Sequence, residues 1–180
     1  MAAGESEVSA VFQQLYPRLC RFLACLLGDR HAAQDVAQEA FLRLHQFGMS
    51  RLAGDERRYW LYRVARNLAL NELGRRRTRT RLIDEVGRWF RPDPPTPETQ
   101  ATEAEASSLI LEVVKSLPEH QRAVLLLREQ EDMSYREIAR VLDISEAKVK
   151  VDLFRARTAA RARWRELHHE TTAARKGQTV

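Results

Sequence analysis

The sequence predicts an all-α protein made of two small helical domains joined by an acidic, proline-rich linker. Its 180 residues suffice for one medium domain or two small ones. Seven glycines and six prolines are too few for the many turns of a β-sandwich or β-barrel, and four of the prolines fall within residues 92–97. A content of 44% hydrophobic and 31% charged residues is typical of a globular chain.

The amino-terminal domain is expected to contain three or four helices, of which three can be placed. Gly28 ends the first, because glycine readily adopts the conformation that closes a helix. Asp29 caps the second, since its side chain can accept from a free backbone amide. Gly74 inside the third would cost ~1 kcal/mol, so we expect that helix to end before it. The helices are predicted over residues 9–27, 30–47 and 55–73 of a domain spanning 8–90.

An acidic segment rich in proline separates the two domains. Residues 91–97 contain four prolines, which neither a helix nor a central strand accommodates. Between residues 92 and 106 there are four acids and no lysine or arginine. We therefore expect an extended linker over residues 91–106. At the other end of the chain, residues 169–180 are expected to form a disordered tail.

Clear helix-start signals mark the carboxy-terminal domain. Ser134 and Glu137 have the spacing of a capping box, in which the two side chains satisfy free backbone amides reciprocally, and so do Ser116 and Glu119. Ser145 is a further candidate cap. The helices are predicted over residues 107–116, 117–130, 134–142 and 145–166 of a domain spanning 107–168.

Each domain contains a strongly basic stretch, although the formal net charge of the chain is only +5. Nine arginines and one acid lie between Arg57 and Arg81, and seven bases and one acid lie between Lys148 and Arg165. Such surfaces attract nucleic-acid phosphates. One basic stretch alone would equally fit a solvated helix face. Two of them, each beside aromatic residues, favour nucleic-acid binding.

Residues 134–153 have the layout of a helix-turn-helix, with a turn at residues 143–145. Apolar side chains on the outward face of the second helix suit a major groove, where they can contact thymine methyl groups. Lysine and arginine side chains beside them can contact guanine edges or phosphates. In the alternative interpretation Phe154 packs on a neighbouring helix. The inward residues are Ile138, Ala139, Leu142, Val149 and Leu153, and the outward ones are Lys150, Val151, Phe154, Arg155, Thr158 and Arg161.

Leu42 on the second predicted helix lies among polar side chains and opposite a broad apolar arc. An outward leucine in this setting indicates a protein-docking patch, although a single exposed leucine is also common.

On the third helix Trp60, Asn67 and Asn71 share one stripe. An indole and two amides beside arginines can stack and hydrogen-bond an unstacked base; the alternative is that Trp60 belongs to the core.

Five stretches, in this order and spacing, resemble bacterial sigma factors of the small two-domain extracytoplasmic-function (ECF) class. They are DVAQEAFLR at 35–43, WLYRVARN at 60–67, LPEHQR at 117–122, SYREIA at 134–139 and VKVDLFRAR at 149–157. The resemblance covers about residues 11–79 and 107–164. Family members often have Asp at position 71, Arg at 74, Gly at 143 and a small polar residue at 151, where this chain has Asn, Gly, Asp and Val.

The resemblance implies a transcription initiation factor whose partners are core RNA polymerase, promoter DNA and an anti-sigma protein. The second helix would dock on the β′ clamp helices, and the helices of 107–130 would touch the β-flap. The third helix and the loop before it would trap a flipped single-stranded base of the −10 element. The helix-turn-helix would read the duplex −35 element. The implied polymerase contacts are Asp35, Gln38, Glu39 and Leu42. The implied −10 contacts are Arg58, Trp60, Arg66, Asn67, Asn71, Arg75, Arg76 and Arg77. The implied −35 contacts are Lys148, Lys150, Val151, Phe154, Arg155 and Arg157.

No catalytic or metal-binding constellation is recognisable. The chain has no phosphate-binding glycine loop and no nucleophile elbow. Cys20, Cys25 and His31 are spaced so that they do not share one helix face. The longest apolar runs are far shorter than the ~20 residues that span a bilayer. We therefore expect a cytoplasmic protein that is not an enzyme, with no cofactor, metal, signal peptide or membrane segment. The main alternative is a one-component helix-turn-helix regulator, which leaves the basic third helix unexplained.

Overall fold

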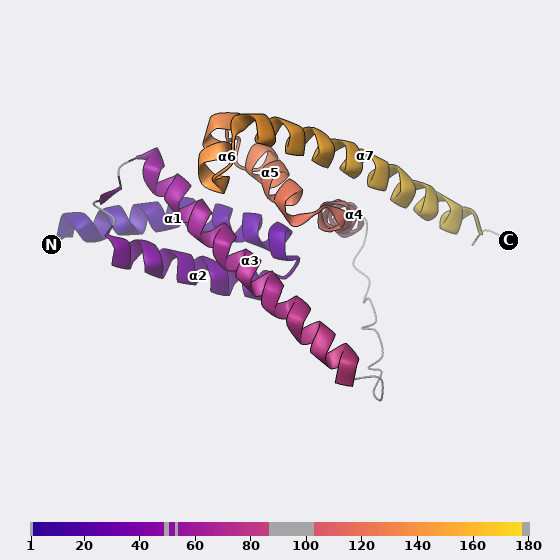
Figure 1. The fold of residues 1–180 in the computed structure, drawn as a ribbon, viewed down its shortest axis with the longest axis horizontal. Helices are drawn as coiled ribbons and strands as arrows, with labels where there is room; N and C mark the ends of the chain where they lie inside the picture. Colours follow the sequence, from indigo (N-terminus) through magenta and orange to yellow (C-terminus); the bar gives the residue numbers. More distant parts are fainter. Residues whose placement is uncertain (1, 49–50, 53, 87–102, 178–180) are drawn as a thin grey trace.

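The computed structural model describes residues 2–48, 51–52, 54–86 and 103–177, and over these residues it consists of seven α-helices without a strand (Figure 1). The predicted all-α class is therefore confirmed. Side chains are described over residues 9–48, 51–52, 54–78 and 109–169. The helices are α1 (Ala2–Leu27), α2 (Arg30–Phe47), α3 (Asp55–Val86), α4 (Glu103–Ser116), α5 (Glu119–Glu129), α6 (Tyr135–Leu142) and α7 (Glu146–Gly177).

Helices α1, α2 and α3 pack on one another around a shared core. The side of α2 that faces this core is lined by alanine, which lets the three helices approach closely. Phe22 of α1 meets Tyr62 of α3 edge to face at 5.4 Å between ring centroids. Residues exposed by no more than 1% in this core are Leu19, Phe22, Leu23, Leu26, Ala33, Ala37, Ala40, Leu44, Leu61, Tyr62, Ala65 and Ala69.

The predicted bounds of α2 are confirmed. Asp29 accepts a hydrogen bond from the Ala32 amide at 3.1 Å, and Gly48, at φ +98°, ends the helix. The prediction that α3 ends before Gly74 is wrong, because the helix continues to Val86. Arg76 bonds Glu72 at 2.9 Å across the glycine, and such a pair one turn apart offsets part of its propensity cost.

In the carboxy-terminal domain two of the three predicted caps are present. The Ser134–Glu137 capping box forms at the start of α6, and Ser145 accepts from the Lys148 amide at 3.2 Å. The predicted box of Ser116 and Glu119 is wrong, because α5 begins after Pro118 with no side-chain cap. The Ser116 hydroxyl instead donates back to the Val113 carbonyl at 2.6 Å.

Two predicted non-helical segments are partly helical. Residues 103–106 of the predicted linker begin α4, since they alternate Glu and Ala, which favour a helix start. Residues 91–102 of that linker lie outside the described residues. The predicted disordered tail is also corrected, because α7 extends to Gly177. No glycine or proline interrupts residues 146–176, so nothing local stops the helix earlier.

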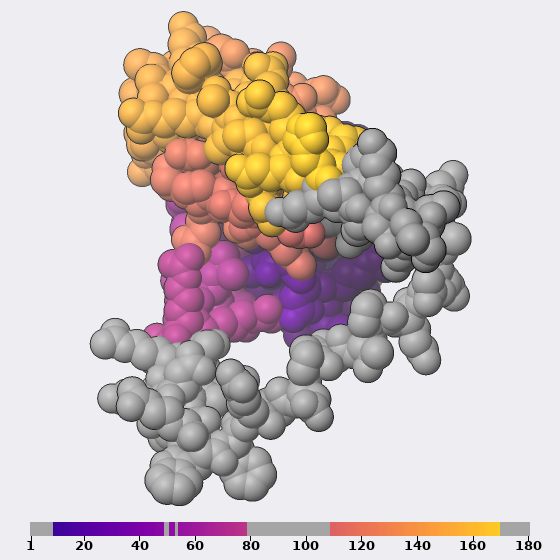
Figure 2. All heavy atoms as spheres, turned by 90° about the vertical axis from the view of Figure 1, so that its right-hand side faces the viewer, coloured from indigo at the N-terminus to yellow at the C-terminus, as the bar shows by residue number. Residues whose placement is uncertain are grey.

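The two domains lie against each other. Helix α5 contacts α1, α6 contacts α3 and α4 contacts α1, and the space-filling view shows the carboxy-terminal helices resting on the amino-terminal ones (Figure 2). Arg122 of α5 joins the parts, because its guanidinium donates to the carbonyls of Leu26 at 2.6 Å, Lys115 at 2.5 Å and Leu117 at 3.0 Å. Within the described residues, no helix has the length and apolar content needed to cross a membrane.

Candidate functional site

The outward face of α2 brings the four predicted polymerase contacts together. Asp35 and Gln38 are exposed, Leu42 is 57% exposed and the Glu39 carboxylate is paired with Arg43 at 2.7 Å. The opposite side of the helix forms the core, so this face is held rigidly toward solvent. The result is an apolar side chain surrounded by acidic and amide groups, a pattern suited to a basic and apolar protein partner.

An aromatic cluster beside this face was not predicted. Phe12 stacks on Tyr16 at 4.5 Å between centroids and meets Phe41 edge-on at 5.0 Å, while remaining 41% exposed. The spacing of four between Phe12 and Tyr16 was the available signal, since it places both rings on one side of α1. The cluster extends the apolar surface of the α1–α2 pair.

At the start of α3, Trp60 is neither fully core nor isolated. Its indole stacks on Phe47 at 5.1 Å between centroids, and the Arg51 guanidinium lies 5.8 Å from the Phe47 ring centre. Phe47 stays 41% exposed, so a face of this stack is open to a flat partner. Asn67 and Asn71 are exposed on the same helix. The sequence analysis placed Phe47 and Arg51 only within the loop of about residues 47–58 expected to engage the −10 element. It did not name them as contacts, because their stacking depends on the path of that loop.

The predicted −10 arginines divide into two groups. Arg75 is exposed, and Arg66 bonds its neighbour Asn67 at 3.2 Å. Arg76 is held by Glu72 and by the helix-capping Asp29, at 2.9 Å from each carboxylate. Arg58 and Arg77 pair instead with acids of the carboxy-terminal domain, Glu131 and Glu119. The structure therefore places part of this predicted DNA surface in the contact between domains.

The helix-turn-helix has the predicted inward and outward faces. Its turn passes through Asp143 in the left-handed conformation at φ +56°, which aspartate tolerates better than most residues. Ile138, Leu142, Val149 and Leu153 are buried and Ala139 is half-buried.

The outward face of α7 rules out the alternative in which Phe154 packs inside the protein, since this side chain is 72% exposed and Val151 is 46% exposed. Lys150 and Arg155 are exposed beside them. The two flanking predicted contacts have internal partners. Lys148 pairs with the buried Asp152 at 2.8 Å, and Arg157 pairs with Glu129 at 2.7 Å.

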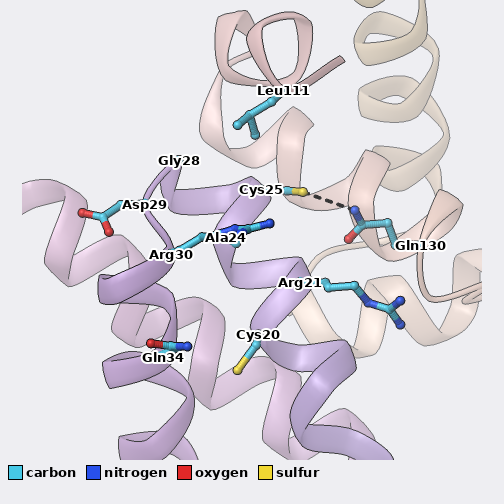
Figure 3. Close-up of a pocket in the computed structure, with 10 residues that line it drawn as sticks. All are labelled: Cys20, Arg21, Ala24, Cys25, Gly28, Asp29, Arg30, Gln34, Leu111 and Gln130. Atoms are coloured by element: carbon cyan, nitrogen blue, oxygen red, sulfur yellow. Dashed lines mark hydrogen bonds between the residues drawn. The ribbon is translucent and has the colours of Figure 1, made fainter. Parts of the chain in front are cut away.

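Two hollows of about 520 Å³ each lie away from these surfaces. The first opens between α1, the start of α2 and α4, beside Gln130 at the end of α5, which donates to the Cys25 sulfur at 3.3 Å (Figure 3). Burial raises the pKa of the Cys20 thiol in this hollow, so it is a poor nucleophile. The second lies between α4 and α7 beside Trp164. In the part of the chain that is described, no three His, Cys, Asp or Glu residues are grouped to hold a metal ion.

Comparisons with known proteins match both domains. Residues 11–79 match the family model of Sigma-70 region 2, and residues 107–159 match that of Sigma-70, region 4. The RNA polymerase sigma-H factor of Pseudomonas aeruginosa is 36% identical over 140 residues, which cover 73% of this chain and 72% of that protein. The ECF RNA polymerase sigma factor SigW of Bacillus subtilis is 30% identical over 177 residues, which cover 91% and 92% of the two chains.

A solved structure has the same fold. It is the co-crystal structure of the sigma factor RpoE in complex with the anti-sigma factor NepR from Bartonella quintana, with a TM-score of 0.68 and 18% identity over 88% of this chain and 97% of that one. A one-component regulator would account only for the helix-turn-helix, whereas both domains match here. The chain therefore belongs to the ECF family of RNA polymerase sigma factors, which act in transcription initiation and are not enzymes.

Proposed function

We propose that this sigma factor binds core RNA polymerase in the cytoplasm through the exposed face of α2, with Asp35, Gln38, Glu39 and Leu42 on the β′ clamp helices. The observation that supports this most is the composition of that face: an exposed leucine lies among acidic and amide groups, directly opposite a fully buried alanine side. A leucine 57% exposed adds nothing to the core, whereas it provides the apolar centre of an interface.

The −10 element binds α3 and the loop before it in this proposal. The Phe47–Trp60 stack offers an aromatic platform for a flipped non-template base, and the amides of Asn67 and Asn71 provide edge-reading groups on the same helix. The basic contacts to the single-stranded backbone come from Arg58, Arg66, Arg75, Arg76 and Arg77.

The −35 element binds the outward face of α7 in the major groove. Val151 and Phe154 supply apolar contacts, and Lys150 and Arg155 supply contacts to guanine edges or phosphate. Lys148 and Arg157 serve at the margins after leaving their internal partners.

Two further partners complete the proposal. The β-flap contacts the surface of α4 and α5, where Ile110 is 55% exposed. An anti-sigma protein holds the free factor, by analogy with the sigma factor RpoE of Bartonella quintana, which was solved in complex with NepR.

The test is binding of charge-reversed variants to core RNA polymerase. Asp35→Lys and Glu39→Lys should each weaken co-elution with core polymerase on a sizing column, and together abolish it, because like charges then face the partner. Glu166→Lys is the matched control, since it reverses one exposed carboxylate at the far end of α7. Co-elution of the double variant as strong as that of the control would refute the α2 assignment.

A further inference from the structure

The hollow beside the two cysteines has walls from both domains. Helix α1 and the start of α2 form one wall, and Leu111 of α4 with Gln130 at the end of α5 forms the other (Figure 3). Its volume of about 520 Å³ lies within the range of about 300–1,000 Å³ that is usual for small-molecule sites in proteins. None of its lining residues is among the contacts that we name for polymerase or DNA. The hollow therefore has the size of a ligand site and no role so far.

Three cations without acidic partners surround this hollow. Arg21 and Arg30 line it, and Figure 3 shows the Arg30 side chain extending from the start of α2 toward α1. A Cβ at Gly28, which also lines the hollow, would lie 3.1 Å from Lys115 Nζ, so the ammonium group on α4 reaches its edge. Within the described residues, these three charged groups take part in no ion pair or hydrogen bond.

The carboxylate of Asp29, the one acid in the described lining, is already occupied. It accepts from the Ala32 amide at 3.1 Å and pairs with Arg76 at 2.9 Å, and these bonds lower its pKa. Figure 3 shows this carboxylate directed away from Arg30. Asp29 therefore does not neutralise the three cations, and the hollow has a positive potential.

The rest of the lining is mostly apolar. Ala24 and Leu111 offer hydrocarbon surface, and the two cysteines add weakly polar thiols. Burial raises the pKa of the Cys20 thiol, so this group stays neutral. Cys25 Sγ accepts a hydrogen bond from Gln130 at 3.3 Å. The lining thus combines apolar surface with positive charge, which suits a ligand that has an apolar body and an anionic group.

We propose that this hollow binds a small anion with an apolar body, of the chemical class of medium-chain carboxylates. The anionic group lies among Arg21, Arg30 and Lys115, and the chain lies against Ala24 and Leu111. The ligand supplies a partner that each cation lacks in the free protein, and its chain removes apolar surface from water. The site is independent of the polymerase and promoter contacts proposed above.

The protein carries reporters for this site, since its only two cysteines line the hollow. The test is modification of the full chain by N-ethylmaleimide, followed at each cysteine by peptide mass spectrometry, with octanoate as the probe. Because only unoccupied protein reacts, the rate at Cys25 should fall about tenfold when octanoate is at about ten times its dissociation constant. Unfolding by octanoate would speed the reaction, so the sign of the change separates binding from denaturation.

Matched probes separate the two parts of the ligand. Acetate has the charge without the chain, and octan-1-ol has the chain without the charge. Each should require a concentration about tenfold higher than that of octanoate, or more, for equal protection. Vesicles of phosphatidylglycerol present anionic groups at a membrane surface, and they should not protect either cysteine.

A matched pair of double variants tests the cations. Arg30→Gln with Lys115→Gln removes two charged groups at the hollow, whereas Lys150→Gln with Arg155→Gln removes two exposed ones on the outward face of α7. Both variants lose the same net charge. The first should weaken octanoate binding about tenfold, and the second should leave it unchanged. Circular dichroism checks that helix content is kept.

Each other outcome overturns the proposal in a distinguishable way. If octanoate protects neither cysteine, the hollow is not a site for this class of ligand, while the proposed polymerase and promoter contacts stand. Equal protection by acetate or by octan-1-ol would show that charge or apolar surface alone is recognised. Protection by vesicles alone would assign the hollow to a membrane surface. Equal weakening in both double variants would identify net charge as the cause.

Discussion

Phe154 is the most exposed of the large apolar side chains in the described part of the chain, at 72%. Its hydrophobic surface is left in water by the folded protein, so its removal should hardly change stability. Val151, one turn back, is 46% exposed, while Val149 and Leu153 on the inward side of the same helix are buried. The wheel of a regular helix thus separates residues that stabilise the fold from residues free to contact DNA.

Phe154→Ala should reduce transcription from a promoter with an intact −35 element by about tenfold, equivalent to ~1.4 kcal/mol, because an apolar base contact is lost. The measurement is run-off transcription by reconstituted holoenzyme on templates with intact and scrambled −35 elements. The free energy of unfolding should change by less than about 0.5 kcal/mol.

Arg155→Ala provides the contrast at this scale. Loss of a phosphate contact should reduce transcription from both templates. It should also lower the slope of log affinity against log salt concentration by about one. An equal loss on both templates for Phe154→Ala would place this side chain outside base recognition.

Helix boundaries were predictable where a residue with a specific conformational role stood at them. Asp29 begins α2 and Ser134 begins α6, because each side chain accepts a hydrogen bond from a free backbone amide nearby. Gly48 ends α2, because glycine adopts a positive φ without strain. None of these roles needs the rest of the protein. The signal at Ser116 failed because α5 begins later than such a box requires, with Pro118 at the N-cap position. At Gly74 the sequence analysis correctly identified the low helix propensity of glycine, but the helical turns on both sides carry α3 through this position.

Gly74→Ala should raise the free energy of unfolding by about 0.5–1 kcal/mol, since an exposed helical glycine is replaced by a better helix former. An added Cβ at this position meets no atom within 4 Å, so no clash opposes the gain. Urea unfolding followed by circular dichroism measures the change.

Gly28→Ala is the companion substitution and should have the opposite effect. Gly28 has φ +69°, where a side chain is strained, and an added Cβ would meet the Lys115 side chain. A loss of about 1–2 kcal/mol is expected. Destabilisation by Gly74→Ala would mean that α3 needs flexibility at this point in the folded protein.

At the scale of the whole molecule, the sequence predicted two domains and the faces they expose, but not how they meet. The period of 3.6 residues sorts inward from outward positions within one helix, which is why Leu42 and Phe154 could be recognised. The contacts of Arg58 with Glu131 and of Tyr59 with Glu137 join residues 73 and 78 positions apart. No local pattern links such partners, so Arg58 was assigned to DNA without its second, internal role.

The capping box of α6, together with the contact of Tyr59 across the domains, should make stability depend on acid pH through Glu137. Hydrogen bonds from Ser134 and from Tyr59 lower the pKa of this carboxyl from 4.5 to about 2. A lowered folded-state pKa stabilises the protein above the ordinary pKa, and this stabilisation is lost as pH falls toward the folded value. The stability difference between wild type and Glu137→Gln should therefore shrink between about pH 4.5 and about pH 2.

Urea unfolding at a series of pH values measures this difference. Tyr59→Phe is the matched variant, since it removes one bond to the carboxylate and leaves those from Ser134. Its pH dependence should lie between those of wild type and Glu137→Gln. If the free energies of unfolding of wild type and Glu137→Gln differ by a constant amount over the whole interval, the pKa of Glu137 is not lowered in the folded protein.

The order of the two domains along the chain gives the contact between them a direction in time. Helices α1, α2 and α3 pack on one another and precede every residue of the carboxy-terminal domain, so they leave the ribosome first. Glu119, Glu131 and Glu137 all follow the arginines that they contact, and about 60 residues separate Arg77 from Glu137. At roughly 5–20 residues per second, a nascent chain would present an uncovered α3 for about 3–12 s. In every newly made molecule α3 is thus uncovered before the carboxy-terminal domain first meets it.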